Sequence, residues 1–269
     1  PQDGQFSFKT TLAETLDFRV STLPTAYGEK LVLRLQKNKP THFDFLTLGL
    51  TESQKSSLLN ALAQPQGLIL VTGPTGSGKS ITLYSALSHL NQPDKHILTA
   101  EDPIEIEIEG IIQTQVNRGI SLDFSQLLRT FLRQDPDIIM LGEIRDEESA
   151  EMALRAAQTG HLVLSTLHTN DAPSAFERLL QLGIKDYELE NALLLVIAQR
   201  LVRKCCVHCA GQGCAECHQG YKGRTGVYQF FAKNGKTFEK LTACLDFQTL
   251  RESAEQKLRM GETNEAEIS

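Results

Sequence analysis

The chain has 269 residues, and its 27 Lys and Arg against 33 Asp and Glu give a formal net charge of −6. Hydrophobic residues make up 41% and charged residues 22% of the chain, which is enough for the core of one or two domains and excludes intrinsic disorder and collagen-like structure. The acidic balance argues against a protein built mainly to coat nucleic acid, because that requires clustered Lys and Arg.

The sequence shows neither a membrane span nor a secretion signal. Its longest uninterrupted apolar run, residues 192–198, has seven residues, whereas a membrane-spanning helix needs about 18 to 20. The first residues are polar and lack the cationic and then apolar segments of a signal peptide. We therefore expect any membrane contact to be peripheral, and the missing initiator Met suggests a fragment.

Two segments near the N-terminus, residues 18–20 and 33–35, place an arginine between apolar residues. Arg19 and Arg34 should each lie on the strand face opposite those apolar neighbours. A turn across residues 24–28 would make a hairpin whose two guanidinium groups share one polar face, which suits phosphate recognition. Two solvated arginines on a sheet surface are an equally good interpretation.

A phosphate-binding loop follows the first predicted strand of the next part of the chain. Residues 68–71 are a short apolar run typical of a buried parallel strand, residues 73–80 read GPTGSGKS, and leucines then recur at helical spacing. Glycines in such a loop let backbone N–H groups surround phosphate oxygens at the start of a helix. Lys79 would reach the β and γ phosphates, and the Ser80 hydroxyl would coordinate Mg²⁺. The predicted nucleotide-binding residues are Gly73, Pro74, Thr75, Gly76, Ser77, Gly78, Lys79 and Ser80.

Carboxylates follow two further predicted strands. Residues 97–100 run into Glu101, and residues 138–141, which come after a predicted helix ended by Asp-Pro-Asp, run into Glu143. An acid just past the C-terminal end of a parallel strand lies where open α/β sheets bind ligands. Glu143 is therefore the first choice of acid, either to hold Mg²⁺ through water or to orient the attacking water. The apolar strand does not itself end in Asp, which departs from the commonest arrangement.

A fourth predicted strand, residues 162–166, runs into His168. The repeated order of apolar strand, polar tip and amphipathic helix predicts a doubly wound α/β fold with a parallel sheet. His168 would share a sheet edge with Glu101 and Glu143, which favours a γ-phosphate contact over a purely structural histidine. Residues 104–109 alternate Ile with Glu and predict a half-exposed strand.

Five of the six cysteines crowd into residues 205–217. Two C-x-x-C pairs could supply four thiolates to a tetrahedral structural Zn²⁺, and without a secretory signal a metal site is favoured over disulfides. Only four residues connect the pairs, and two glycines among them would permit the tight return. The predicted ligands are Cys206, Cys209, Cys214 and Cys217. The alternative ligands are Cys205, His208 and His218.

The C-terminal segment, residues 241–258, predicts a helix. Its apolar face would serve packing rather than a partner. The face comprises Leu245, Leu250, Ala254 and Leu258.

Five motifs in this order resemble those of the type II secretion and type IV pilus assembly ATPases. The resemblance covers nearly the whole chain, and residues 220–227 together with the cysteine pairs favour the assembly branch over the retraction motors, which lack the tetracysteine element. The motifs are GPTGSGKS at 73–80, AEDPIE at 100–105, LRQDPDIIMLGEIRD at 132–146, TGHLVLSTLHTND at 159–171 and AQRLVRKCCVHC at 198–209.

The resemblance implies a RecA-like P-loop ATPase that works as a hexameric motor with ATP, Mg²⁺ and Zn²⁺. Such a motor acts from the cytoplasmic side of the inner membrane, where it fuels movement of pilin-like subunits through an inner-membrane platform protein and meets cytoplasmic docking proteins. It implies that Glu101 and Glu143 act on the water and Mg²⁺, and that His168 lies near the nucleotide. Arg19 and Arg34 would contact nucleotide at domain or subunit interfaces.

The resemblance also implies an order of domains along the chain. The expected parts are residues 1–36 as the end of a small α+β domain, 37–44 as a linker, 45–204 as the RecA-like core, 205–220 as the tetracysteine element and 221–269 as the last strand and helical segment of the ATPase domain.

Two other functions are consistent with parts of the sequence. One is a nucleotide-gated scaffold of the same membrane complex with little turnover, against which the intact Lys79, Ser80, Glu101 and Glu143 argue. The other is a RecA-like nucleic-acid translocase, against which the net charge of −6 and the lack of an aromatic and basic stripe argue.

Overall fold

The computed structural model describes residues 2–9, 15–36, 43–232 and 248–268. The chain divides into two compact units, Pro1–His42 and Phe43–Ser269, and each is described by itself. The predicted linker falls mainly on residues 37–42, which lie outside the described residues.

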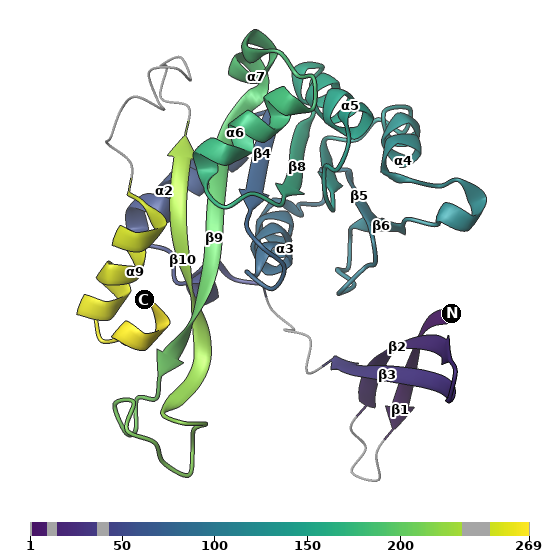
Figure 1. Cartoon of the computed structure of the whole chain (residues 1–269). Coiled ribbons are helices and arrows are strands. Elements are labelled where there is room, and N and C mark those ends of the chain that lie inside the picture. The colour runs from purple at the N-terminus through teal and green to yellow at the C-terminus, as the bar shows by residue number, and fades with distance from the viewer. Residues whose placement is uncertain (1, 10–14, 37–42, 233–247, 269) are drawn as a thin grey trace. The chain divides into compact units, whose positions relative to one another are not determined.

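The first unit is a three-stranded antiparallel sheet with the strand order β1-β2-β3 (Figure 1). The predicted hairpin is confirmed, because β2 pairs with β3 and places Arg19 directly opposite Arg34. The alternating residues on the other face are apolar, and the rings of Phe6 and Phe18 stack there at 5.2 Å between centroids. The strands are β1 (Gln2–Lys9), β2 (Thr15–Thr25) and β3 (Gly28–Gln36).

The second unit is built on a seven-stranded sheet with the order β10-β9-β4-β8-β7-β5-β6. Every neighbouring pair is parallel except β9 with β10, which is antiparallel. All four strands predicted from apolar runs are present, and the α/β fold class is confirmed. The strands are β4 (Gly67–Thr72), β5 (Ile97–Glu101), β6 (Ile112–Gln115), β7 (Ile138–Leu141), β8 (Leu162–Leu167), β9 (Leu193–Cys205) and β10 (Tyr221–Ala232).

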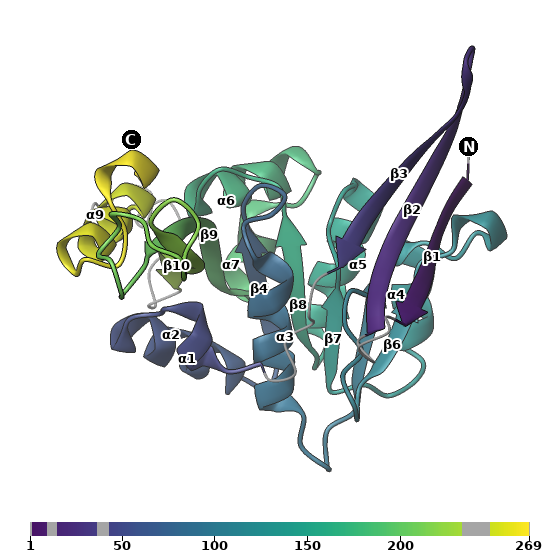
Figure 2. The same ribbon diagram turned by 90° about the horizontal axis from the view of Figure 1, so that it is seen from below.

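Helices cover both faces of this sheet (Figures 1 and 2). In β4, Ile69 and Val71 pack in the core beneath the first three helices, whereas Leu68 and Leu70 pack in the core beneath the next four. Burial on both sides explains why the central strands are continuous apolar runs rather than alternating ones. One face carries α1 (Phe45–Leu48), α2 (Glu52–Leu62) and α3 (Lys79–Leu90). The other carries α4 (Phe124–Phe131), α5 (Glu147–Gln158), α6 (Ala172–Gln181) and α7 (Asp186–Ala192).

The prediction of a strand at residues 104–109 is wrong. This segment is irregular, and the edge strand β6 follows it. Ile106 and Ile108 pack against the core beneath α3. The backbone between them is bonded by a side chain instead of a neighbouring strand. The Gln113 amide donates to the Ile106 carbonyl at 3.0 Å and accepts from the Ile108 N–H at 2.7 Å.

The C-terminal helix starts later than predicted. α9 spans Leu250–Arg259, and Thr249 caps it by a reciprocal capping box with Glu252, so residues 248 and 249 are not helical. Residues 241–247, which include Leu245, lie outside the described residues. Ala254 packs against Val202 and Val227, which confirms a packing role for that position.

Two short 3₁₀ turns, Arg118–Ile120 and Glu265–Glu267, complete the elements of the second unit. None of the helices in the described ranges combines the length and the apolar character that crossing a bilayer requires.

Candidate nucleotide-binding site

The loop between β4 and α3 has the backbone of a phosphate cradle. Gly73 and Gly78 take φ values of +148° and +89°, which L side chains rarely adopt. A Cβ at Gly73 would lie 2.5 Å from the Gln199 carbonyl oxygen, and one at Gly78 would lie 2.8 Å from the Gln199 side-chain nitrogen. Both glycines are therefore required for the loop to pack against β9.

Polar groups of this loop are available to an anion. The Lys79 ammonium donates to the carbonyls of Gly73 at 2.7 Å and Pro74 at 3.2 Å, so it lies folded over the loop. Burial lowers the pKa of Lys79, and the Glu143 carboxylate partly opposes that shift. The Ser77 hydroxyl is buried and has no hydrogen-bond partner among the residues that the structure describes. An anion at the start of α3 would offer the Lys79 ammonium an alternative partner.

Glu143 lies just past the end of β7, where it meets the side chains of Arg145 and His168. One carboxylate oxygen accepts from Arg145 at 2.5 Å, and the other lies 3.8 Å from Nε2 of His168. The Glu143 side chain is 15% exposed, so these interactions are partly shielded from water. The structure thus brings Lys79, Glu143 and His168 to one edge of the sheet.

The environment of His168 keeps its imidazole neutral at pH 7. Burial lowers the pKa of His168, the positive charge of Lys79 lowers it further, and Glu143 acts in the opposite direction. A neutral imidazole has one N–H donor and one nitrogen that can accept a hydrogen bond. It can therefore contact a phosphate oxygen or a water without adding a positive charge.

Glu101, at the end of β5, is 3% exposed and faces α3 rather than the Glu143 group. Its carboxylate accepts hydrogen bonds from Tyr84 at 2.5 Å, from Thr99 at 2.6 Å and from Gln113 at 2.9 Å. In the described part of the chain, no hydrogen bond or ion pair joins Glu101 to Glu143. The two predicted acids therefore lie at neighbouring strand ends but in different hydrogen-bonding networks.

Residues that sequence reasoning did not select support this site. Arg200 donates to the Asn170 carbonyl at 2.7 Å and so joins β9 to the tip that carries His168. Gln199 accepts from Thr82 of α3 at 2.7 Å. The sequence motifs quoted above contain Arg145, Gln199 and Arg200, so these three residues could have been selected from the sequence. Tyr84 and Gln113, which donate to Glu101, lie outside the quoted motifs and were not selected from the sequence.

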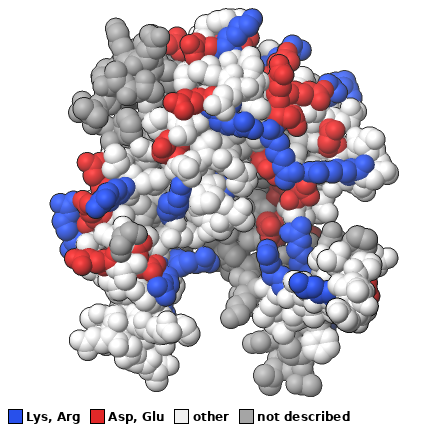
Figure 3. Space-filling view, viewed as in Figure 1, with Lys and Arg blue, Asp and Glu red and all other residues white. Residues whose placement is uncertain are grey.

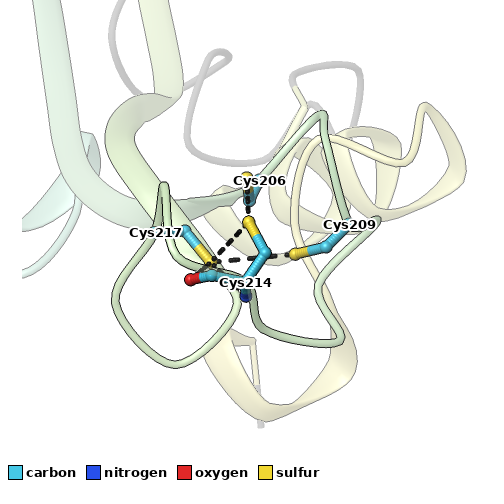
Figure 4. A group of neighbouring side chains, drawn as sticks. All are labelled: Cys206, Cys209, Cys214 and Cys217. Atoms are coloured by element: carbon cyan, nitrogen blue, oxygen red, sulfur yellow. Dashed lines mark hydrogen bonds between the residues drawn. The ribbon is translucent and has the colours of Figure 1, made fainter.

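The four predicted cysteine ligands converge in the loop between β9 and β10 (Figure 4). Their sulfur atoms lie within 4.8 Å of one another, and three separations are 3.6, 3.7 and 3.9 Å. A tetrahedron with metal–sulfur bonds of about 2.3 Å separates its sulfurs by about 3.8 Å. Disulfide sulfurs lie only about 2.05 Å apart, so the arrangement fits a shared metal and not two disulfides.

The short connection between the cysteine pairs closes as expected, because Gly211 and Gly213 both have positive φ, +88° and +98°. Among the described residues, the group of possible metal ligands contains neither Cys205 nor His208 nor His218. Cys244 lies outside the described residues.

Arg19 and Arg34 belong to the first unit. As directly opposed residues of β2 and β3 they present their side chains on the same face of the sheet, opposite the apolar one. The two guanidinium groups are therefore available to one ligand from a single face.

A glycine-rich phosphate cradle on a parallel sheet, with an acid and a histidine at the same edge, defines a P-loop protein of the RecA-like α/β class. Residues 1–269 match the family model for the type II/IV secretion system protein. The chain therefore belongs to the type II/IV secretion system protein family.

Named relatives agree with this assignment. The chain is 65% identical over 270 residues to a "Protein transport protein HofB homolog" of Haemophilus influenzae, with 100% of this chain and 57% of the relative covered. It is 47% identical over 268 residues to the "Type IV pilus assembly ATPase PilB" of Pseudomonas aeruginosa, with 90% of this chain and 47% of the relative covered. The chain thus spans about half the length of these relatives.

A solved structure supports the same fold. The pilus retraction motor PilT with bound ADP superposes with a TM-score of 0.73 at 30% identity, over 99% of this chain and 76% of that chain.

We predict that His168 titrates below pH 6.5, its ordinary midpoint, in an NMR titration of the imidazole signals. Lys79→Met should raise the midpoint, because removal of a positive charge makes protonation easier. Glu143→Gln should lower it for the opposite reason. Lys55→Met, a lysine of α2, serves as the control and should leave the midpoint unchanged. A midpoint at or above 6.5 would contradict this electrostatic account.

Proposed function

We propose that this chain is the nucleotide-hydrolysing part of an ATP-driven motor that powers assembly of type IV pili or type II secretion pseudopili. The observation that carries the proposal is the edge where Lys79 of the phosphate cradle meets Glu143 and His168, in a chain of the type II/IV secretion family. The named relative PilB, a pilus assembly ATPase, supports the assembly branch.

The phosphate cradle comprises residues 73–80. Lys79 would exchange its two carbonyl contacts for β and γ phosphate oxygens. Ser80 follows Lys79 in the first turn of α3 and has an exposed side chain, so its hydroxyl fits a hard cation that prefers oxygen ligands. Bound Mg²⁺ would neutralise charge on the phosphates.

In this proposal Glu143 is the acid nearest the reaction. It is partly buried, lies close enough to Lys79 to affect its pKa, and can accept a proton from a water or orient that water. Arg145 donates to one carboxylate oxygen of Glu143, and the other oxygen lies nearer to His168. The neutral imidazole of His168 would donate a hydrogen bond to an oxygen of the γ phosphate. Glu101 is proposed as the second acid.

Arg19 and Arg34 are proposed to contact the nucleotide, as the family resemblance implies. Their paired placement on the polar face of the β2–β3 hairpin supports this role, because two neighbouring guanidinium groups can donate several hydrogen bonds to one phosphate group.

For the whole assembly, we propose a homohexamer bound peripherally at the cytoplasmic side of the inner membrane. Its partners would be an inner-membrane platform protein and cytoplasmic docking proteins of a pilus or secretion machine. Nucleic acid is not an expected partner. Figure 3 shows acidic and basic side chains interspersed on the face it displays, where nucleic-acid binding would favour a continuous basic stripe.

The tetracysteine group is proposed to hold a structural Zn²⁺ through Cys206, Cys209, Cys214 and Cys217. The sulfur separations support this, and so do two backbone N–H groups that donate to sulfur, from Gly213 to Cys209 and from Cys214 to Cys217, each at 3.2 Å. Four protein ligands leave no open position, so the metal would stabilise the loop and take no part in hydrolysis.

The motor proposal predicts Mg²⁺-dependent ATP turnover that rises with protein concentration as the chain assembles. Lys79→Ala should abolish turnover, and Glu143→Gln should lower kcat by roughly 10²- to 10³-fold, because it removes the group that acts on water. Glu151→Gln changes an exposed glutamate of α5, is the matched control and should keep wild-type turnover. Nucleotide binding with no turnover at any concentration would instead support the scaffold alternative, and stimulation by nucleic acid would support a translocase.

The arginine proposal predicts that an Arg19→Ala and Arg34→Ala double variant loses roughly tenfold or more of its kcat at saturating ATP, as loss of one or two charge-assisted hydrogen bonds would produce. Steady-state ATPase assays at matched protein concentration measure this. Arg251→Ala removes an exposed arginine of α9 and is the control. Wild-type hydrolysis by the double variant would refute the role.

The zinc proposal predicts one Zn²⁺ per purified chain by elemental analysis. Cys206→Ser should lose the metal and lower Tm by about 4–8 °C, which corresponds to roughly 2 kcal/mol in a protein of this size. Cys205→Ser changes the neighbouring cysteine, which lies outside the group, and should retain metal and Tm. Metal-free protein whose Tm does not respond to a chelator would contradict the proposal.

A further inference from the structure

A buried tyrosine of the P-loop helix is bonded directly to Glu101. Tyr84 lies five residues after Lys79 in α3 and is 2% exposed. Its hydroxyl donates to one carboxylate oxygen of Glu101 at 2.5 Å and accepts from the backbone N–H of Glu105 at 3.2 Å. One phenol thus connects the helix that begins at the phosphate cradle with the acid at the end of β5 and with the loop that follows it.

The other oxygen of Glu101 is held from two further directions. Thr99 donates to it from the same strand at 2.6 Å, and Gln113 donates from β6 at 2.9 Å. The carboxylate therefore has donors from three elements. Among these donors, only Tyr84 belongs to the helix that carries Lys79, so it alone links the orientation of Glu101 to the position of α3.

The surroundings of Tyr84 keep its hydroxyl protonated, so that it can donate a hydrogen bond. Burial raises the pKa of Tyr84, and the hydrogen bond to Glu101 raises it further, so the hydroxyl stays protonated over the working range of the protein. The phenol donates to the Glu101 carboxylate at 2.5 Å, which is a short hydrogen bond. Such a bond fixes the rotamer of the acid at the sheet edge.

We propose that Tyr84 is a positioning residue for hydrolysis, which holds the Glu101 carboxylate in register with the phosphate cradle. The inference rests on the proposed ATPase function and on Glu101 as its second acid. In this proposal Tyr84 acts through Glu101 and not by contact with the nucleotide. Its contribution is to transmit the position of the helix that carries Lys79 to an acid on a neighbouring strand.

The test compares Tyr84→Phe with Tyr228→Phe under the conditions in which the wild type turns over ATP. Both changes remove one buried hydroxyl and keep the ring, and Tyr228 donates to the Leu48 carbonyl at 2.9 Å, with no bond to Glu101. Tyr84→Phe should lower kcat roughly tenfold while KM, the affinity for a fluorescent ADP analogue and oligomer size stay within about twofold. Tyr228→Phe should leave kcat unchanged.

A second background separates positioning from core packing. Glu101→Asp shortens the acid and withdraws its carboxylate from Tyr84, so Tyr84→Phe should reduce kcat by less than about twofold in that background, as coupled residues do in a double-mutant cycle. Equal losses in both backgrounds would mean that Tyr84 acts independently of Glu101 and would overturn the inference.

Other outcomes are equally decisive. If Tyr84→Phe and Tyr228→Phe have the same kcat, or if Tyr84→Phe lowers nucleotide affinity, Tm and kcat together, the tyrosine is structural and the inference fails while the proposed function stands. Wild-type protein without turnover, or Lys79→Ala protein that keeps it, would overturn the proposed function and this inference with it.

Discussion

The parallel pairing of β4 between β8 and β9 is the constraint on which the rest of the second unit depends. Six consecutive residues of β4 are buried, and each neighbour continues its ladder. Parallel strands end at the same edge, so the loop after β4, the tip of β8 and the polar residues of β9 must meet there. Hydrophobic burial holds the strands together, and the polar residues that follow their carboxyl ends form the site.

This arrangement gives the phosphate cradle a rigid support that is itself polar. Gln199 and Arg200 on β9 approach the loop so closely that glycine is required at two of its positions, and the same two residues bond to α3 and to the tip of β8. Movement of the phosphate cradle would therefore shift both α3 and the residues after β8 that include His168.

The tetracysteine group is stabilised in a different way. The loop between β9 and β10 contributes little to the two main cores, and its close approach of four sulfurs is the feature that organises it. Bonding of β9 to the C-terminal residues adds to this, since Arg203 pairs with Glu267 and stacks on Tyr221 at 4.0 Å from the ring centroid. Polar contacts and the cysteine group thus lie beside the small apolar cluster of Val202, Val227 and Ala254 at this end of the long β-ribbon.

The sequence by itself predicted the β2–β3 hairpin, the strands β4, β5, β7 and β8, the glycine-rich loop and the cysteine group, because each depends on local spacing of apolar, glycine or cysteine residues. It misjudged residues 104–109, where Ile and Glu alternate as in a strand but Gln113 occupies the backbone hydrogen bonds. Only the tertiary structure decided that Glu101 faces Tyr84 whereas Glu143 faces Arg145 and His168. Neighbouring strand ends look alike in sequence, but α3 brings Tyr84 to Glu101, whereas the loops after β7 and β8 bring Arg145 and His168 to Glu143.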